Sequence, residues 1–548
     1  MSEPLLYFNG VNAGTGTYLV PPMPASALAT IARGDAVNAD TLADAKWRAT
    51  QKQSHLGVKA GVDATDLAQA GWGVIFAQGE NPAVRDALRE LLDYRQAQAN
   101  QSKERYREYW GDDGYLPGES KNAFLARHGV GPGAVDPDKV PYYLLLVGDP
   151  EKIPYSFQYQ LDVAYAVGRI HFDTTAEYAQ YAQSVVRAEK GLVARGKRAV
   201  FFSAANPDDP STQASTQNLA QPLADKMRVS QTAWTFDSYL ADGATKTRLE
   251  ALLKDDAPAF LFTATHGAGF DYGEPRQVKH QGALICQDWS GPKAMANRPI
   301  PQSMYYAMDD VPGDARVHGM IAFHFACFGA GTPRYDEFAH LRQGVKTILE
   351  PMQLAPYAFV ARLPRALLAH PKGGALAVIG HVDRAWGASF LWNSKIEQLS
   401  TFESMLTRLL DGYPIGAAME FFNERYAELA ASLSSDLENL KKPYIKVNLD
   451  EFSMLWTANN DARGYAVLGD PAVRIQSQAR APNAPVMESI TLSAETSSPV
   501  APNDALNTTA SETSEQQIEA TIAKLERQVA DLNATIQALR AALQSKST

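Results

Sequence analysis

Two short stretches of the sequence place a reactive side chain between an apolar, strand-like run and a glycine-rich turn. The apolar run 259–265 is followed directly by His266 and Gly267. The run 320–326 is followed by Cys327 and then by a Phe-Gly-Ala-Gly sequence. A cysteine thiolate is a strong nucleophile, and an imidazole beside it can manage the proton. The two stretches therefore predict a Cys/His pair for nucleophilic catalysis.

The backbone around this pair also suits acyl transfer. Glycine next to each reactive residue allows a substrate carbonyl to approach the main chain, so the N–H groups of Gly267 and Cys327 are natural oxyanion donors. Each residue alone has a structural alternative, because free cysteine is often a small buried hydrophobic residue and histidine can be a satisfied core residue. Two such residues in matching contexts favour the catalytic interpretation.

The remaining cysteine and histidines are weaker candidates. His324 lies three residues before Cys327, and an odd separation on a strand points the two side chains to opposite faces, so His324 is expected to pack. His381 also follows an apolar run and is the second candidate for the base. Cys286 lies in an apolar run and is expected to be structural. Cys286 and His280 are too few ligands for zinc, so neither a metal nor a cofactor is expected.

Continuous apolar runs alternate with helical segments over most of the chain. This pattern predicts an α/β fold with a doubly wound, mostly parallel sheet flanked by helices. Ligands bind beyond the carboxyl ends of such strands, which is where His266 and Cys327 lie. The main runs are 140–148, 198–203, 259–265, 320–326, 374–379 and 465–468.

The sequence suggests four regions. Residues 1–140, with a predicted strand at 71–77 and a helix at 81–100, form a smaller α/β region that packs beside the main sheet or extends it. Residues 141–478 form the catalytic domain. Residues 479–513 are rich in Ala, Pro, Ser, Thr and Asn and predict a disordered linker. Residues 514–546 carry four heptads and predict a coiled coil, with a parallel dimer favoured over a helix that docks on its own domain.

Composition excludes several classes of protein. The 548 residues are 45% hydrophobic and 20% charged, with a net charge of −10, which argues against both wholesale disorder and nucleic-acid binding. Two cysteines cannot form a disulfide framework, which fits a reducing compartment. No apolar run is long enough to span a membrane, and the first residues lack the features of a secretory signal. We therefore expect a cytoplasmic protein that binds neither nucleic acid nor membrane.

With these residues in place, the sequence resembles the caspase-like cysteine peptidases, and within them the gingipain-like branch, over about residues 140–475. The resemblance implies that Cys327 attacks the scissile carbonyl and that His266 protonates the leaving amine. It also implies that the amides of Gly267 and Cys327 hold the oxyanion. The similar blocks, in order, are 144–154, 162–165 with 168–170, 266–267, 326–327, 375–380 with Trp386, and 465–471.

The same resemblance implies a substrate preference. An Asp at the position of Asp162 forms the floor of the first specificity pocket in gingipain-like enzymes, and an aromatic residue such as Trp386 stacks along the substrate side chain. A carboxylate and an aromatic wall suit Arg or Lys before the cut. The alternative is that Asp162 caps a turn or pairs with Arg169.

The chain also departs from that family. The segment between His266 and Cys327 is longer, so residues 272–312 are expected to be an insertion or a hairpin beside the site, and a coiled coil is foreign to the pattern. The hypothesis is an intracellular, bacterial-type cysteine endopeptidase that cleaves a protein or peptide and is regulated by assembly or proximity through 514–546. The alternative is a catalytically idle caspase-like scaffold that binds a partner and oligomerises through that coil.

Overall fold

The computed structural model describes residues 5–6, 8–19, 23–24, 57–336, 353–392, 396–440, 442 and 444–478. The predicted linker 479–513 and coiled coil 514–546 lie outside the described residues. Within the described part, no helix combines the length and the apolar character needed to cross a bilayer.

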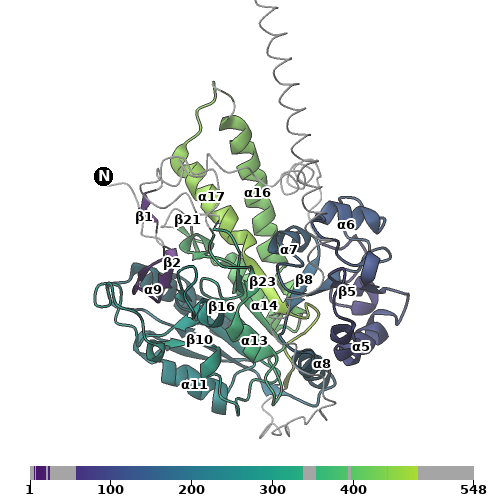
Figure 1. The fold of residues 1–548 in the computed structure, drawn as a ribbon, viewed down its shortest axis with the longest axis horizontal. Coiled ribbons are helices and arrows are strands. Elements are labelled where there is room, and N and C mark those ends of the chain that lie inside the picture. The colour runs from purple at the N-terminus through teal and green to yellow at the C-terminus, as the bar shows by residue number, and fades with distance from the viewer. Residues whose placement is uncertain are drawn as a thin grey trace, which may run out of the picture. The chain divides into compact units, whose positions relative to one another are not determined.

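The centre of the molecule is a ten-stranded sheet (Figure 1). Each of the apolar runs predicted as strands belongs to it, including 71–77 from the first 140 residues. From one edge to the other the strands are β11 (Thr235–Leu240), β10 (Arg198–Ser203), β12 (Phe260–Ala264), β16 (Ile321–Phe325), β19 (Ala377–His381), β23 (Tyr465–Gly469), β8 (Ala166–Ile170), β7 (Tyr143–Val147), β5 (Trp72–Phe76) and β6 (Tyr106–Tyr109).

The sheet consists of two parallel halves that run in opposite directions. The strands β11, β10, β12, β16 and β19 are parallel to one another, and so are β23, β8, β7, β5 and β6. The halves meet at the antiparallel pair of β19 and β23, where His381 lies opposite Tyr465. The prediction of a mostly parallel sheet is confirmed. The carboxyl ends of β12, β16 and β19 therefore lie on the same side of the sheet as the amino ends of β23 and β8. We call this side, where the strands end, the site edge.

Apolar residues at matching register hold the sheet together. Phe201, Phe262 and Phe323 are cross-strand partners on β10, β12 and β16, and their rings form a continuous ladder. Phe402 of α14 (Ser400–Leu410) packs on the rings of Phe262 and Phe323. All four rings are buried, and burying each one contributes about 1.5–3 kcal/mol. The packing of these rings thus fixes the relative positions of β10, β12 and β16 without any contribution from the site residues.

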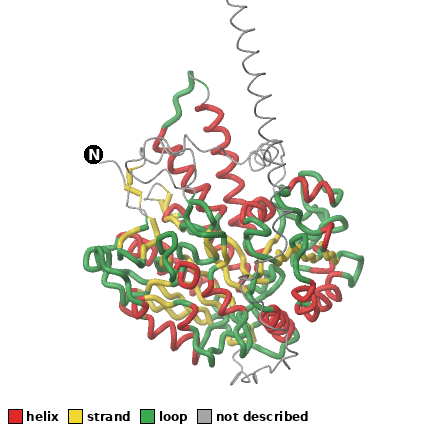
Figure 2. Tube along the Cα trace, viewed as in Figure 1, coloured by secondary structure: helices red, strands yellow, loops and turns green. Residues whose placement is uncertain are grey.

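Helices flank this sheet, and loops connect the helices to the strands (Figure 2). The long helices α16 (Glu420–Leu440) and α17 (Leu449–Arg463) lie side by side near its site edge (Figure 1). The other helices are α3 (Leu67–Ala70), α4 (Pro82–Ala87), α5 (Arg89–Ala99), α6 (Lys121–Arg127), α7 (Tyr155–Asp162), α8 (Thr175–Glu189), α9 (Pro210–Ser215), α10 (Gln221–Ser230), α11 (Lys246–Asp255), α12 (Gln277–His280), α13 (Arg362–Leu368) and α15 (Ile415–Ala418).

A second, smaller sheet covers the site edge. Its strand order is β15 (Tyr305–Tyr306), β14 (Leu284–Ile285), β13 (Gly267–Gly269), β2 (Phe8–Asn12) and β20 (Ala385–Trp386), and β3 (Thr17–Tyr18) pairs with β2. Residues 272–312, for which an insertion or a hairpin was predicted, contain the antiparallel pair of β14 and β15. The strand β2 comes from the far N-terminal part of the chain and lies in the middle of this sheet.

A buried ion network joins the two ends of the main fold. Arg95 of α5 forms ion pairs with Glu189 of α8 and with Asp470, which follows β23, at 2.7 Å each. Asp470 also accepts a hydrogen bond from the indole N–H of Trp72 at 2.9 Å. The Arg95 side chain is 1% exposed and that of Asp470 is fully buried. This network holds β5 and α5, from the first 140 residues, against the closing strand.

We expect Arg95→Met to destabilise the fold by about 3–5 kcal/mol, because it leaves two buried carboxylates without their cation. The measurement is the melting temperature of the purified chain. The matched control is Arg89→Met, since Arg89 pairs with Asp93 and Glu108 but is 41% exposed, and such pairs contribute about 0–1 kcal/mol. Equal melting temperatures for the two variants would show that the buried network has no special role.

Candidate active site

The register of two neighbouring strands brings the backbone after His266 against the backbone of Cys327. The last paired residues of β12 and β16 are Ala264 and Phe325, and the Thr265 N–H donates to the Phe325 carbonyl at 3.1 Å. The strands therefore end at the same height. A methyl group on Gly267 would lie 1.8 Å from the carbonyl oxygen of Cys327, so the two backbones touch and only glycine fits.

The turn that carries Cys327 is fixed by the strand on its other side. Phe328 has a φ of 57°, a left-handed conformation that non-glycine residues adopt rarely. Its N–H donates to the Asp383 carbonyl at 2.6 Å, and the Ala330 N–H donates to the His381 carbonyl at 3.0 Å. The thiol of Cys327 donates to the Ala385 carbonyl at 3.7 Å. The residues after β19 thus hold the turn and face the sulfur.

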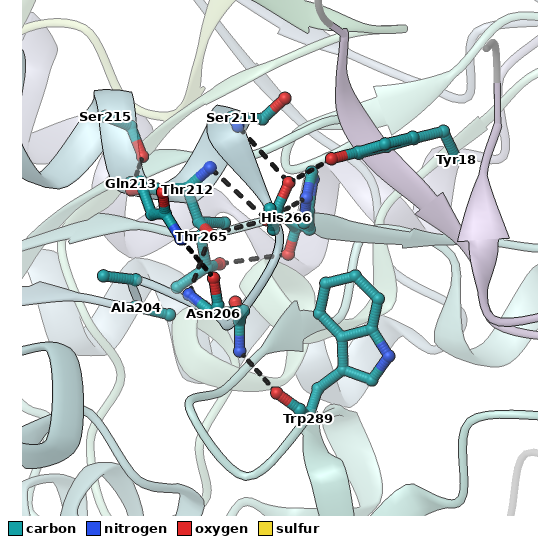
Figure 3. Close-up of polar contacts among 12 residues, drawn as sticks. Tyr18, Ala204, Asn206, Ser211, Thr212, Gln213, Ser215, Thr265, His266 and Trp289 are labelled. Carbon is teal, nitrogen blue, oxygen red and sulfur yellow. Dashed lines mark hydrogen bonds and ion pairs between the residues drawn. The ribbon is translucent and has the colours of Figure 1, made fainter. Parts of the chain in front are cut away.

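The His266 ring is held in one orientation. Its Nε2 forms a hydrogen bond with Asp209 Oδ2 at 2.8 Å. The ring lies between Tyr18 and Trp289, with centroid distances of 5.8 and 5.6 Å, and Figure 3 shows both aromatic side chains around it. Nδ1 is buried and has no hydrogen-bond partner among the described residues. Nδ1 is therefore the ring nitrogen that is available to a further hydrogen-bond partner.

The carboxylate behind His266 is strongly stabilised in its charged form. Asp209 precedes α9 as its N-cap, and it accepts hydrogen bonds from the backbone of Ser211, the hydroxyl of Thr212 and the phenol of Tyr18. Burial alone would raise the pKa of Asp209, but the charge of His266 and these hydrogen bonds lower it to about 2. Asp209 is thus an ionised partner for His266 across the whole physiological range.

Asp209 was not among the residues predicted from the sequence. The signal was present, because Asp209 follows the predicted strand 198–203 and stands before Pro210, a typical N-cap sequence. The strand β10 neighbours β12, so its carboxyl end lies at the same edge as His266. Applying the strand-end rule to this third strand would have pointed to the loop that contains Asp209.

The described arrangement keeps the thiol neutral. Cys327 and His266 are both 0% exposed. Burial raises the pKa of Cys327, while the Ala385 carbonyl contact and the charge of Arg384 oppose the rise only in part. A thiolate therefore does not form readily at Cys327 in these surroundings.

The alternative residues have other partners. His324 is buried on β16, and burial lowers its pKa to about 4, in agreement with the predicted packing role. His381 forms a hydrogen bond through its Nε2 with the carbonyl oxygen of Asp461 at 2.8 Å. His280 contacts the Tyr305 hydroxyl and Asp309, and not Cys286. Among the described residues there is no cluster of side chains suited to a metal ion.

Trp386 and Asp162 occupy different parts of this edge. Trp386 is 2% exposed and lies on β20 next to Ala385, which contacts the thiol. Its backbone N–H donates a hydrogen bond to Asp461 Oδ1 at 2.9 Å. Asp162 ends α7 just before β8, three strands from β16, or about 14 Å at the usual strand spacing. Both therefore lie on the edge that carries Cys327, but Asp162 does not touch the thiol loop.

The Asp162 carboxyl is not neutralised by Arg169. Arg169 donates to Gln158, Gly148 and Ile153 instead. Removal of water raises the pKa of Asp162 well above its ordinary value, although the Val167 N–H and the charge of Arg169 lower it in part. The hydrogen bonds of Asp162 with the Val167 N–H and the Gln158 side chain fit the alternative prediction that it caps a turn.

A second carboxylate lies closer to the thiol. Asp383 lines a small polar pocket with Tyr159, His381 and Arg463, and its Oδ2 has no hydrogen-bond partner among the described residues. Burial and the nearby Asp336 raise its pKa to about 7, against the charge of Arg384. Sequence reasoning missed Asp383, because nothing in its neighbourhood suggests a pocket before the fold is known.

In overall structure the chain is similar to solved proteases at low identity. The crystal structure of the Arg-specific cysteine proteinase gingipain R (RGPB) aligns with a TM-score of 0.41 and 12% identity, over 77% of this chain and 82% of that one. A structure described only as a protease gives 0.41 and 13%, over 74% and 79%. A complex of the Porphyromonas gingivalis RgpB pro- and mature domains gives 0.40 and 12%, over 75% and 81%.

No family model matches the sequence, and no curated protein matches it. Every TM-score is below 0.5, so the assignment of the site depends on its own geometry.

We expect Asp209→Asn to lower the melting temperature at pH 7, and we expect this difference to shrink between about pH 5 and pH 2. An ordinary Asp has a pKa of about 3.9, whereas folded Asp209 has a pKa of about 2. The stability from its ionised form is therefore present above pH 4 and is lost as the pH falls toward 2. The control is Asp242→Asn on an exposed loop. A difference that stays constant with pH would contradict the ionised pairing.

Proposed function

We propose that this chain is a cysteine endopeptidase in which Cys327 is the nucleophile and His266 exchanges the proton. The observation that supports this most strongly is the hydrogen bond that the carboxylate of Asp209 accepts from His266 Nε2, which leaves Nδ1 for the reaction, together with the backbone contact of Gly267 and Cys327. A histidine oriented by a buried carboxylate next to a cysteine is the arrangement that acyl transfer requires.

In the proposed mechanism the Cys327 thiol gives its proton to His266 Nδ1, and the resulting thiolate attacks the scissile carbonyl carbon. The negative charge moves to the carbonyl oxygen, and the N–H groups of Gly267 and Cys327 stabilise it. The C–N bond then breaks, and His266 Nδ1 gives its proton to the leaving amine. Water, deprotonated by the same nitrogen, hydrolyses the thioester and restores the thiol. Asp209 acts through His266 as a positioning residue.

The proposal includes cleavage after Arg or Lys. Two carboxyl groups support it, namely Asp162 at the end of α7 and Asp383 in the pocket beside the thiol turn. The indole of Trp386 on β20 supplies an aromatic wall at the same edge. We also propose that the enzyme is intracellular and that residues 514–546 regulate it by self-association.

A scaffold that binds a partner without catalysis is the second candidate. The observation that favours it is the complete burial of Cys327 and His266, because a nucleophile without access to substrate cannot act. The ionised Asp209 behind His266 favours the enzyme, since a packed histidine in a scaffold needs no buried charge next to it.

We expect purified wild type to cleave members of a fluorogenic peptide library, and we expect Cys327→Ala and His266→Ala each to lower kcat/KM by about 10³-fold or more. The control is Cys286→Ala, which removes the other buried thiol and leaves the site intact. Cleavage that survives in Cys327→Ala would contradict the mechanism. A wild type that does not cleave, and whose Cys327 reacts no faster than Cys286 with a peptidyl thiol probe, would favour the scaffold.

We expect selectivity for Arg or Lys over a neutral residue at the cut to rise with pH through about 7. Asp383 has a raised pKa of about 7, so it becomes charged over this range. Asp383→Asn should remove this rise, and Asp162→Asn tests the more distant carboxyl separately. The measurement is kcat/KM for matched peptides. A preference for Asp or Glu would instead assign the pocket to Arg384 and Arg463.

A further inference from the structure

The strand that covers the catalytic pair comes from the other end of the sequence. β2 lies between β13 and β20, which are not paired with each other. It runs parallel to β13, with Gly10 opposite Gly267, and antiparallel to β20, with Asn9 opposite Ala385. Without β2, two strand edges would face each other across a gap one strand wide. Such edges bind extended peptides by adding a strand.

Both walls of this gap belong to the catalytic site. β13 begins directly after His266, and β20 contains Ala385, whose carbonyl accepts the Cys327 thiol. Any extended chain between them passes over the sulfur. This is the path that a scissile peptide must take.

Gly10 occupies the position over the thiol. A methyl group on Gly10 would lie 2.8 Å from the Cys327 sulfur and 2.9 Å from Leu19 Cδ1. No side chain fits there, so the backbone of β2 lies directly against the nucleophile. A peptide carbonyl needs the same close approach to be attacked.

The hairpin of β2 and β3 is also tied to the histidine side of the site. The Tyr18 hydroxyl donates to Asp209 Oδ1 at 2.5 Å, and the Tyr18 ring packs on His266 (Figure 3). Next to Gly10, Val11 is fully buried in a cluster with Ala268 and Trp289. The covering segment thus contacts all three members of the site, Cys327, His266 and Asp209.

We propose that the gap between β13 and β20 is the peptide-binding channel, and that residues 8–12 occupy it as an intramolecular ligand. The channel takes an extended peptide, parallel to β13 and antiparallel to β20, whose backbone passes over the sulfur as that of β2 does. A substrate enters by replacing β2. The role of the channel in binding substrate rests on the proposed function. The occupancy of the channel by residues 8–12 does not depend on it.

The test is the alkylation of Cys327 by iodoacetamide in the full chain, followed by mass spectrometry, with Cys286 as an internal reference. In Gly10→Val the new side chain displaces β2, so we expect Cys327 to react at least about tenfold faster than in wild type, with Cys286 unchanged. Gly10→Ala should give a smaller increase. Gly313→Val is the matched control, because Gly313 is exposed and has open space around it.

A second experiment supplies the sequence of β2 as a separate peptide. A synthetic peptide with the sequence of residues 5–14 should slow the alkylation of Cys327 in Gly10→Val, whereas the same peptide with valine at the position of Gly10 should not. No change in Cys327 reactivity in Gly10→Val, or no protection by the peptide, would overturn the proposal. A parallel rise at Cys286 would overturn it too, because β2 would then be a structural strand of the whole domain.

These readouts are separate from peptidase activity. If the peptide protects Cys327 but no peptide in the library is cleaved, the channel stands and the proposed hydrolysis fails. If the library is cleaved equally by wild type and Gly10→Val, hydrolysis stands and the occupancy of the channel fails.

Discussion

The contact between the backbones of Gly267 and Cys327 is the constraint on which the rest of the site depends. It requires β12 and β16 to end at the same height, which the pairing of Ala264 with Phe325 ensures. It also requires a residue without a side chain after His266. The phenylalanine ladder beneath keeps the two strands from sliding, because a shift of one residue would turn each ring to the other face. The placement of His266 and Cys327, the proposed catalytic pair, is therefore a product of sheet register.

Sequence reasoning located the elements that depend on local pattern. The apolar runs became strands, and His266 and Cys327 lie at their ends, because a continuous apolar run has few alternatives to a buried strand. The reversal between β19 and β23 was not predicted. A short apolar run such as Tyr465–Gly469 has the same pattern in either direction, so only the packing of the whole sheet decides its orientation.

The residues that were missed depend on contacts between distant parts of the chain. Asp209 lies in a loop with no periodicity, and its role appears only when β10 is placed beside β12. The strand β2 is harder still to find, since Phe8–Asn12 contains one glycine and two asparagines, residue types that are depleted in strands. Its partner β3 is close in sequence, but its other two partners, β13 and β20, are short strands far from it in the chain. Propensity could not have found it.

In the proposed channel, the site covered by β2 and a site filled with substrate would make similar physical demands. In both, a strand excludes water from Cys327, which disfavours the thiolate while no reaction partner is present. A substrate differs from β2 in one respect, namely that it brings an electrophilic carbonyl and a leaving amine to the sulfur and to His266 Nδ1. Asp209 is already ionised and oriented in the covered state, so little reorganisation remains when the strands exchange. On this proposal, a channel that fits β2 closely would also be prepared for the chemistry of a peptide that replaces it.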